Sequence, residues 1–185
     1  MGGREGERAG ADWSKMIRSC TPDDRDAILE IINDAAEAYR AVIPPDRWHD
    51  PYMSGAALDR ELAAGVAFLG WDAPADGLIG VMGAQAVRDV TLIRHAYVRT
   101  ARRGQGIGAR LLAALMADLD RPVLVGTWRA ADWAIRFYRR NGFQLLGRDE
   151  TTRLLRAYWT IPERQIETSV VLAGPGWGRE TQSPP

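Results

Sequence analysis

Hydrophobic and polar positions in the first third of the chain follow two different periods and predict one strand followed by two helices. Residues 16–20 have the composition of a strand, and residues 21–24 (Thr-Pro-Asp-Asp) supply an N-cap, a first-turn proline and early acids for a helix over 22–39. Residues 42–52 hold three prolines and are therefore expected to be irregular. A shorter helix is predicted over 54–65, with a serine as its cap.

The remaining sequence predicts a hairpin, a strand that leads into a helix, and a further strand and helix before two final strands. Apolar runs on either side of an Asp-Ala-Pro-Ala-Asp-Gly turn indicate the hairpin, and Asp132 and Gly142 are placed to begin and end the last helix. The predicted segments are strands 66–71, 78–87 and 91–99, a helix from 107, a strand 122–127, a helix 132–142, a strand 144–147, a helical turn within 151–159 and a strand 165–172.

This order of elements predicts an α/β (α+β) fold in which helices flank a mixed sheet, in one domain over residues 16–173. The 185 residues, 46% hydrophobic and 26% charged, are enough to bury a single core. Residues 1–15 and 174–185 are rich in glycine, proline and charge, and we expect them to be flexible tails.

A basic, glycine-rich turn lies between the strand 91–99 and the helix that follows it. Gly104, Gly106 and Gly108 can adopt backbone angles that other residues avoid, so main-chain N–H groups there can approach an anion closely. The following helix directs the positive end of its dipole into the turn, and Arg102 and Arg103 add positive charge. The turn lacks the lysine of a nucleotide P-loop, and its glycines are spaced too closely for a dinucleotide fingerprint. The pattern predicts a site for a phosphorylated ligand of another kind.

Two segments carry a resemblance to a known family. Residues 103–108 (Arg-Gly-Gln-Gly-Ile-Gly) fit the pattern Gln/Arg-x-x-Gly-x-Gly/Ala, and residues 133–143 contain Ala-x-x-Phe-Tyr followed by Gly-Phe. These segments resemble motifs A and B of the GNAT superfamily of acyl-CoA-dependent N-acyltransferases, and they occur in the family's order. The resemblance covers the elements from Met16 to Leu172.

The resemblance implies a mostly antiparallel twisted sheet whose central parallel strand pair is splayed to hold acetyl-CoA as co-substrate, without a metal. The pyrophosphate would lie on the motif A turn and the pantetheine arm along the preceding strand. Ala131 departs from the family, where an Asn commonly precedes the motif B helix, and Trp128 and Trp133 crowd the same region, so one usual contact is absent or replaced. The implied cofactor-binding residues are Ala96, Tyr97, Val98, Arg99, Arg102, Arg103, Gly104, Gln105, Gly106, Ile107, Gly108, Ala109 and Tyr138.

Tyr138 stands where many family members carry a tyrosine near the thioester sulfur, so the resemblance implies that it is the general acid. A phenol of ordinary pKa, roughly 10, can protonate a departing thiolate. The alternative is that Phe137 and Tyr138 form the apolar face of an amphipathic helix.

Two histidines are candidates for the base that deprotonates the attacking amine. His95 lies on the strand before motif A, but strand alternation turns it away from the face of Arg94, Ala96 and Val98 unless a bulge shifts the register. His49 lies in the proline-rich loop. A proton path through water is the third alternative.

The acceptor site is predicted from the aromatic loop and the strand beside it. Trp48, His49, Tyr52 and Arg94 are the candidate acceptor contacts, and they favour a small-molecule amine as the acceptor. The alternatives are an acetyltransferase for protein or peptide amines and a catalytically idle acyl-CoA-binding sensor. The acids of the first helix, Glu30 among them, are interpreted as a solvated face.

Charge and cysteine content exclude several partner classes. The formal net charge is +0, which argues against nucleic acid as a partner, and no apolar run is long enough to span a membrane. The single cysteine, Cys20, is expected to be buried and inert, and it suits a reducing, cytoplasmic location. Because members of the family often dimerise, a homodimer is an alternative to a monomer.

Overall fold

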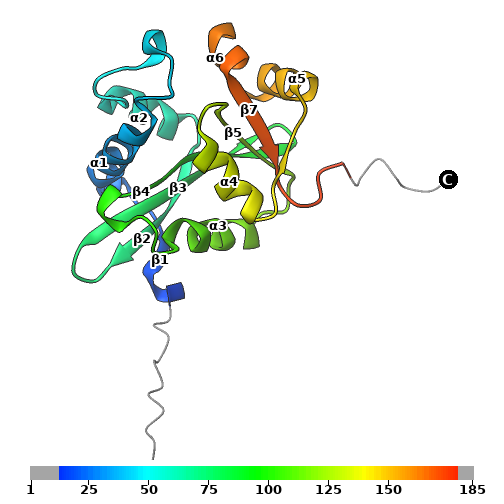
Figure 1. The fold of residues 1–185 in the computed structure, drawn as a ribbon. Coiled ribbons are helices and arrows are strands. Elements are labelled where there is room, and N and C mark those ends of the chain that lie inside the picture. The colour runs from blue at the N-terminus through cyan, green and yellow to red at the C-terminus, as the bar shows by residue number, and fades with distance from the viewer. Residues whose placement is uncertain (1–12, 179–185) are drawn as a thin grey trace, which may run out of the picture.

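The computed structural model describes residues 13–178, and within them one twisted sheet organises the fold (Figure 1). The strand order is β1-β2-β3-β4-β5-β7-β6, and all neighbours are antiparallel except β4 and β5. The strands are β1 (Ile17–Ser19), β2 (Ala67–Ala73), β3 (Gly77–Val87), β4 (Val90–Val98), β5 (Val123–Trp128), β6 (Gln144–Leu145) and β7 (Ser169–Ala173). The structure confirms the mixed, mostly antiparallel sheet with one central parallel pair.

Six α-helices of the described chain cover the two faces of this sheet. They are α1 (Arg25–Ala36), α2 (Gly55–Ala63), α3 (Ile107–Ala117), α4 (Asp132–Arg140), α5 (Arg148–Tyr158) and α6 (Glu163–Thr168). Short 3-10 turns occupy Trp13–Met16, Pro22–Asp24, Glu37–Tyr39, Pro45–Arg47 and Thr100–Arg102. None of the helices over residues 13–178 is both long and apolar enough to cross a bilayer.

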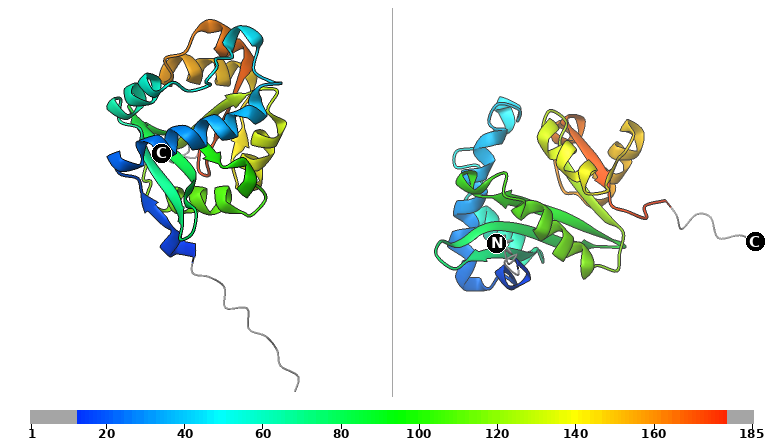
Figure 2. Two further views of the ribbon diagram at one scale, coloured as in Figure 1. Left: turned by 90° about the vertical axis from the view of Figure 1, so that its left-hand side faces the viewer. Right: turned by 60° about the horizontal axis from the view of Figure 1, so that its bottom comes forward.

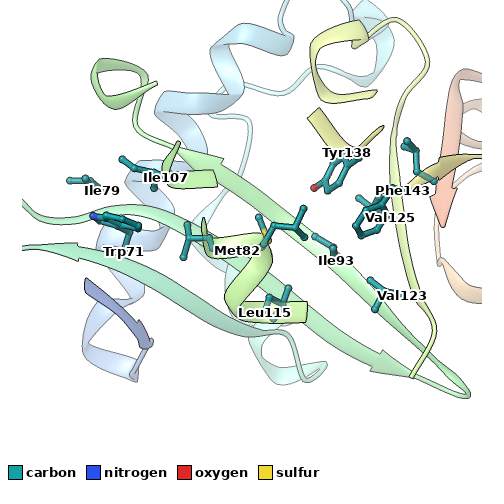
Figure 3. Close-up of a cluster of buried hydrophobic side chains, with 13 residues drawn as sticks. Trp71, Ile79, Met82, Ile93, Ile107, Leu115, Val123, Val125, Tyr138 and Phe143 are labelled. Carbon is teal, nitrogen blue, oxygen red and sulfur yellow. The ribbon is translucent and has the colours of Figure 1, made fainter. Parts of the chain in front are cut away.

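Alternating side chains on the strands form separate cores on the two faces. On one face, α3 packs its leucines against β3 and β4, and Tyr138 and Phe143 from the α4 region join the same cluster (Figure 3). On the other face, α1 and α2 pack on Leu78 and Val81, while α5 and α6 pack on Leu92 and neighbouring strands. The sheet therefore separates the α3 and α4 face from the α1, α2, α5 and α6 face.

The parallel pair β4 and β5 separates after a short pairing. Only Thr91–Ile93 and Val123–Val125 are in register, and no pairing of the two strands continues beyond them in the described residues. The right-hand view of Figure 2 shows β5 and β7, with α4 to α6, diverging from the strands β1 to β4. The C-terminal ends of β4 and β5 are therefore separated by a gap, although both segments remain strands.

A bulge in β4 lies at this point of divergence. Val81 of β3 pairs with Tyr97, but Gly83 pairs with Arg94, so β4 contains one extra residue between these two pairs. His95 lies in it, with a left-handed φ of +49°. A non-glycine residue with such an angle is strained by roughly 1–3 kcal/mol, and such residues concentrate at functional sites. The bulge also moves Arg94 off the face of Ala96 and Val98, which corrects the face assignment made from strict alternation.

Several predicted boundaries were wrong. Residues 165–168 belong to α6 and not to the last strand, because Pro162 begins a helical turn there. The helical turn within 151–159 is a helix of 11 residues, α5. Asp132 is the first residue of α4, and its side chain makes no capping bond, whereas Gly142 ends the helix with φ +86° as predicted.

The two predicted tails lie mostly outside the described residues. Their described parts are ordered into local structure. Residues 13–16 form a 3-10 turn, Gly174 N–H donates to Val123 O, and Trp177 Nε1 donates to Glu150 Oε1 at 3.1 Å.

Ser54 caps α2, as the sequence predicted. Its side-chain oxygen accepts a hydrogen bond from Ala57 N–H at 3.2 Å. We expect Ser54→Ala to lower the free energy of unfolding by about 1 kcal/mol, because that N–H loses its side-chain acceptor and keeps only the Ser54 carbonyl, whereas Ser54→Asp keeps the cap. Thermal denaturation should show a loss of about 2–4 °C for the alanine variant, and equal midpoints for the two variants would contradict this role.

Cys20 is half-buried beside β2 in the α1 and α2 core. Burial raises the pKa of its thiol from 9.0 to about 11. The thiolate is the reactive form, so at pH 8 we expect iodoacetamide to alkylate native Cys20 about a hundredfold more slowly than the unfolded chain. A mass-spectrometric time course measures both rates; similar rates would show that the thiol is not protected.

Candidate active site

The turn between β4 and α3 presents free backbone N–H groups. Gly104 and Gly106 have φ of +76° and +77°, the left-handed region in which a side chain is strained. Gly106 is the N-cap of α3. Within the described residues, the N–H groups of residues 104–109 donate to no acceptor. Because these donors lie at the positive end of a helix dipole, they form a site suited to an anion.

The C-terminal end of α1 holds this turn in place. Thr100 N–H donates to Asp34 Oδ2 at 2.6 Å, and Arg103 Nη2 donates to the Ala35 carbonyl at 2.8 Å. Arg99 Nη2 lies 3.1 Å from Glu30 Oε2. Glu30 and Asp34 are thus structural partners of the turn, which corrects their interpretation as a merely solvated face.

A cleft of about 620 Å³ opens on the α3 and α4 face above this turn. Three arginines line it, Arg102, Arg103 and Arg140, together with Trp133 and Phe137 from α4. The remaining wall consists of Ala35, Tyr39, Val81, Met82, Ala96, Tyr97, Val98, Gly104, Gly106, Ile107, Gly108, Ala109, Ala134 and Tyr138. A Cβ added at Gly108 would lie 3.5 Å from the Phe137 ring, so glycine there leaves room beside the turn.

Eleven of the thirteen predicted cofactor contacts line this cleft, and two do not. Arg99 instead pairs with Glu30, and its Nε donates to Leu78 O at 3.2 Å. Gln105 is exposed and lies outside the cleft wall. Tyr39, Trp133 and Arg140 were missed, because they are brought to the cleft by packing between elements far apart in sequence. The usual asparagine before α4 is replaced by Ala131, which is fully buried against Ile43 and Trp128.

A second, smaller cavity of about 170 Å³ lies where β4 and β5 diverge. Arg94 and His95 of β4 face Gly126 and Trp128 of β5 across it, and Tyr52 lies beside them. The other wall residues are Tyr39, Ile93, Ala96, Tyr97, Val125, Thr127, Tyr138, Leu155, Trp159, Ile161, Gln165 and Ser169.

The cleft and the cavity share four wall residues, Tyr39, Ala96, Tyr97 and Tyr138. They therefore adjoin each other in the gap between the splayed strands, with these four side chains at the boundary. Figure 3 shows the Tyr138 hydroxyl pointing away from Phe143, with the ring packed in the core. A group entering from the cleft and another entering from the cavity would meet at this junction.

Burial keeps the tyrosines at the junction protonated. Burial raises the pKa of the Tyr138 phenol far above its usual value, with a smaller contribution from Tyr39. It also raises the pKa of Tyr39, Tyr52 and Tyr97. At neutral pH these side chains are hydroxyl donors and not anions, so the junction can offer hydrogen bonds to a developing negative charge.

His95 lies in a charged cluster at the edge of the cavity. Its imidazole stacks on Phe68, with 6.1 Å between ring centroids, and Nε2 lies 3.5 Å from Glu61 Oε2 without forming a hydrogen bond. Arg94 Nη2 donates to both Glu61 oxygens, at 2.6 and 2.8 Å. Burial alone would raise the pKa of Glu61, but His95 and Arg94 hold it below its ordinary value, so the carboxylate stays ionised.

The aromatic loop contributes only part of what the sequence predicted. Tyr52 lines the cavity, and Trp48 packs against it with 5.5 Å between ring centroids, held under Arg40. His49 is exposed and lines neither the cleft nor the cavity. The structure therefore brings Tyr52, Arg94 and His95 to the cavity but leaves His49 outside it. No cluster of three His, Cys, Asp or Glu side chains suited to a metal occurs between residues 13 and 178.

Part of the chain matches the model of a known protein family. Residues 65–145, which include the β4 bulge, the glycine turn and α4, match the family model described as an acetyltransferase (GNAT) domain.

Solved structures show the same fold. The PaiA N-acetyltransferase of Thermoplasma acidophilum, solved with coenzyme A, is 16% identical with a TM-score of 0.61, over 85% of this chain and 96% of that one. The ribosomal-protein-S18-alanine N-acetyltransferase of Escherichia coli is 16% identical with a TM-score of 0.61, over 85% and 91%. The putative acetyltransferase yncA of Salmonella typhimurium, solved with acetyl-CoA, is 23% identical with a TM-score of 0.55, over 71% and 80%.

Proposed function

Because the chain belongs to the GNAT family and is an acyltransferase, we propose that it moves an acetyl group from acetyl-CoA to the primary amine of a small molecule. The observation that carries the proposal is the meeting of the cleft and the cavity at Tyr138. Such a junction allows two substrates to react directly in one ternary complex.

The cleft has the chemistry that acetyl-CoA requires. Six free N–H groups at residues 104–109 suit a pyrophosphate, and Arg102, Arg103 and Arg140 supply compensating charge. The unpaired edge of β4 beyond Ile93 suits the amide groups of a pantetheine arm. When bound, acetyl-CoA supplies an acetyl group activated as a thioester.

Tyr138 is the proposed acid. As the amine nitrogen bonds to the carbonyl carbon, the carbon–sulfur bond breaks and negative charge develops on sulfur. The Tyr138 hydroxyl hydrogen-bonds this sulfur and supplies the proton that completes the thiol, and the proton taken from the amine then returns through water to restore the phenol. Since a thiol is ordinarily the stronger acid, with a pKa of about 8.5, we assign most of the effect to stabilisation of the developing thiolate.

His95 is the proposed base, and its position supports this role over His49. It lies at the cavity wall beside the ionised Glu61, whereas His49 is exposed outside both spaces. A proton removed from the amine would be held on the imidazole, where the Glu61 carboxylate compensates the charge. An ordered water between the amine and His95 would serve the same path.

The small volume of the cavity supports a small-molecule acceptor over a protein. A volume of about 170 Å³ lies below the roughly 300–1,000 Å³ of pockets for drug-sized ligands. The cavity that adjoins the cleft at Tyr138 argues against an idle sensor, which needs only the cleft.

The proposal is tested by incubating the protein with acetyl-CoA and a panel of primary amines. We expect release of the CoA thiol to match N-acetyl product one for one, with no acetyl group retained on the protein when the amine is omitted. Binding of acetyl-CoA without product from any small amine or peptide would contradict the proposal and favour the sensor.

A further inference from the structure

We infer that Trp159 is the specificity-determining wall of the acceptor cavity, and that the acceptor is a compact amine with an apolar body and no second cationic group. This inference rests on the proposed function. It follows from three independent features of the cavity, namely its helical wall, its size and its charge.

The helical wall comes from the segment between β6 and β7. In the described chain this connection contains α5 and α6, and Figure 1 places both helices across the strand divergence from α1 and α2. Leu155, Trp159 and Ile161 of this segment line the cavity but not the cleft. They therefore face the body of an acceptor and not the reacting thioester.

Trp159 fits closely against β5. A Cβ added at Gly126 would lie 3.4 Å from two carbons of the indole, at van der Waals contact, so the ring lies directly over the strand at this position. The backbone N–H of Trp159 also donates to the Leu155 carbonyl at 3.0 Å, which fixes the residue at the end of α5. The indole is thus a positioned wall, and its removal would extend the cavity.

Size limits the acceptor. Since a cavity of about 170 Å³ is smaller than those that take drug-sized ligands, an amine with one ring fills it. Three of the cavity's four tyrosines, Tyr39, Tyr97 and Tyr138, also line the cleft, whereas the apolar side chains of the helical wall line the cavity alone. An amine with a polar head and an apolar body matches this division.

Charge excludes a diamine. Arg94 and His95 are the charged or titratable side chains on the wall, apart from its tyrosines, and no Asp or Glu among the described residues lines the cavity. Glu61, the carboxylate that contacts both of these side chains, is already engaged by them. A second ammonium group would meet Arg94 without a counter-ion, which is unfavourable.

The test compares kcat/KM for 2-phenylethylamine, ethylamine and 1,4-diaminobutane at saturating acetyl-CoA. We expect the wild-type protein to favour 2-phenylethylamine over the diamine by at least about tenfold. In Trp159→Ala, KM for 2-phenylethylamine should rise about tenfold, while ethylamine kinetics and acetyl-CoA affinity change by less than about twofold. In Trp159→Leu, which keeps part of the apolar volume, the KM for 2-phenylethylamine should lie between the values of the wild type and of Trp159→Ala.

Trp177→Ala is the matched control. Trp177 packs on the same core cluster as Trp159 but lines neither the cleft nor the cavity, so its loss should leave the ratio of the amines unchanged. A preference for the diamine, an unchanged ratio in both Trp159 variants, or an equal change in Trp177→Ala would overturn the inference while acetyl transfer itself persists. Absence of transfer to every amine would instead contradict the proposed function.

Discussion

Replacing Tyr138 by Phe is expected to lower kcat for acetyl transfer by about two to three orders of magnitude. The variant keeps the ring that packs against Phe143 and Phe137 but loses the hydroxyl at the junction of the cleft and the cavity. The developing thiolate then has no hydroxyl partner at that position. The dissociation constant of acetyl-CoA should stay within about twofold, because the ring still fills its place.

Steady-state kinetics with calorimetric binding measures both quantities. Tyr158→Phe is the matched control, since the Tyr158 hydroxyl donates to Asp89 at 2.8 Å and lines neither space. Turnover of Tyr138→Phe within twofold of the wild type would remove Tyr138 from the mechanism and direct attention to Tyr39 and Tyr97.

Arg103→Ala is expected to weaken acetyl-CoA binding by about ten- to a hundredfold, the effect of losing a hydrogen bond to a charged group. Arg103 lines the cleft beside the free N–H groups, and its guanidinium is already oriented by the Ala35 carbonyl. A preoriented cation loses little side-chain entropy on binding a phosphate.

Arg136→Ala is the control for this variant, because Arg136 is exposed on α4, lines neither space and changes the net charge equally. Equal calorimetric affinities for the two variants would show that the phosphates bind elsewhere. A loss confined to Arg103→Ala supports the assignment of the cleft.

The sequence predicted best those parts of the site that depend on local backbone chemistry. The glycine turn, the helix after it and the strand before it follow from residue types at fixed spacing, and the structure has all three. The cap at Ser54 and the left-handed residue at Gly142 were also predictable for this reason.

The parts that sequence reasoning missed depend on long-range packing. The bulge at His95 arises from the pairing of β3 with β4, and alternation alone cannot place it. Helix α6 takes in residues 165–168 of the predicted last strand, and β7 forms the rest of it. Pro162 begins this helix, and the burial of Ile166 in the core outweighs the local β-propensity of these residues. Glu61 meets His95 across 34 positions in sequence, and no local pattern marks that contact.

Hydrogen–deuterium exchange with and without acetyl-CoA tests the central claim most directly, because it locates the bound phosphates on the backbone. We expect saturating acetyl-CoA to slow exchange at the N–H groups of residues 104–109, which have no acceptor in the free protein. Exchange in the strand pair β1 and β2, which lines neither the cleft nor the cavity, should stay unchanged. Unchanged exchange at 104–109, with or without protection elsewhere, would contradict the account.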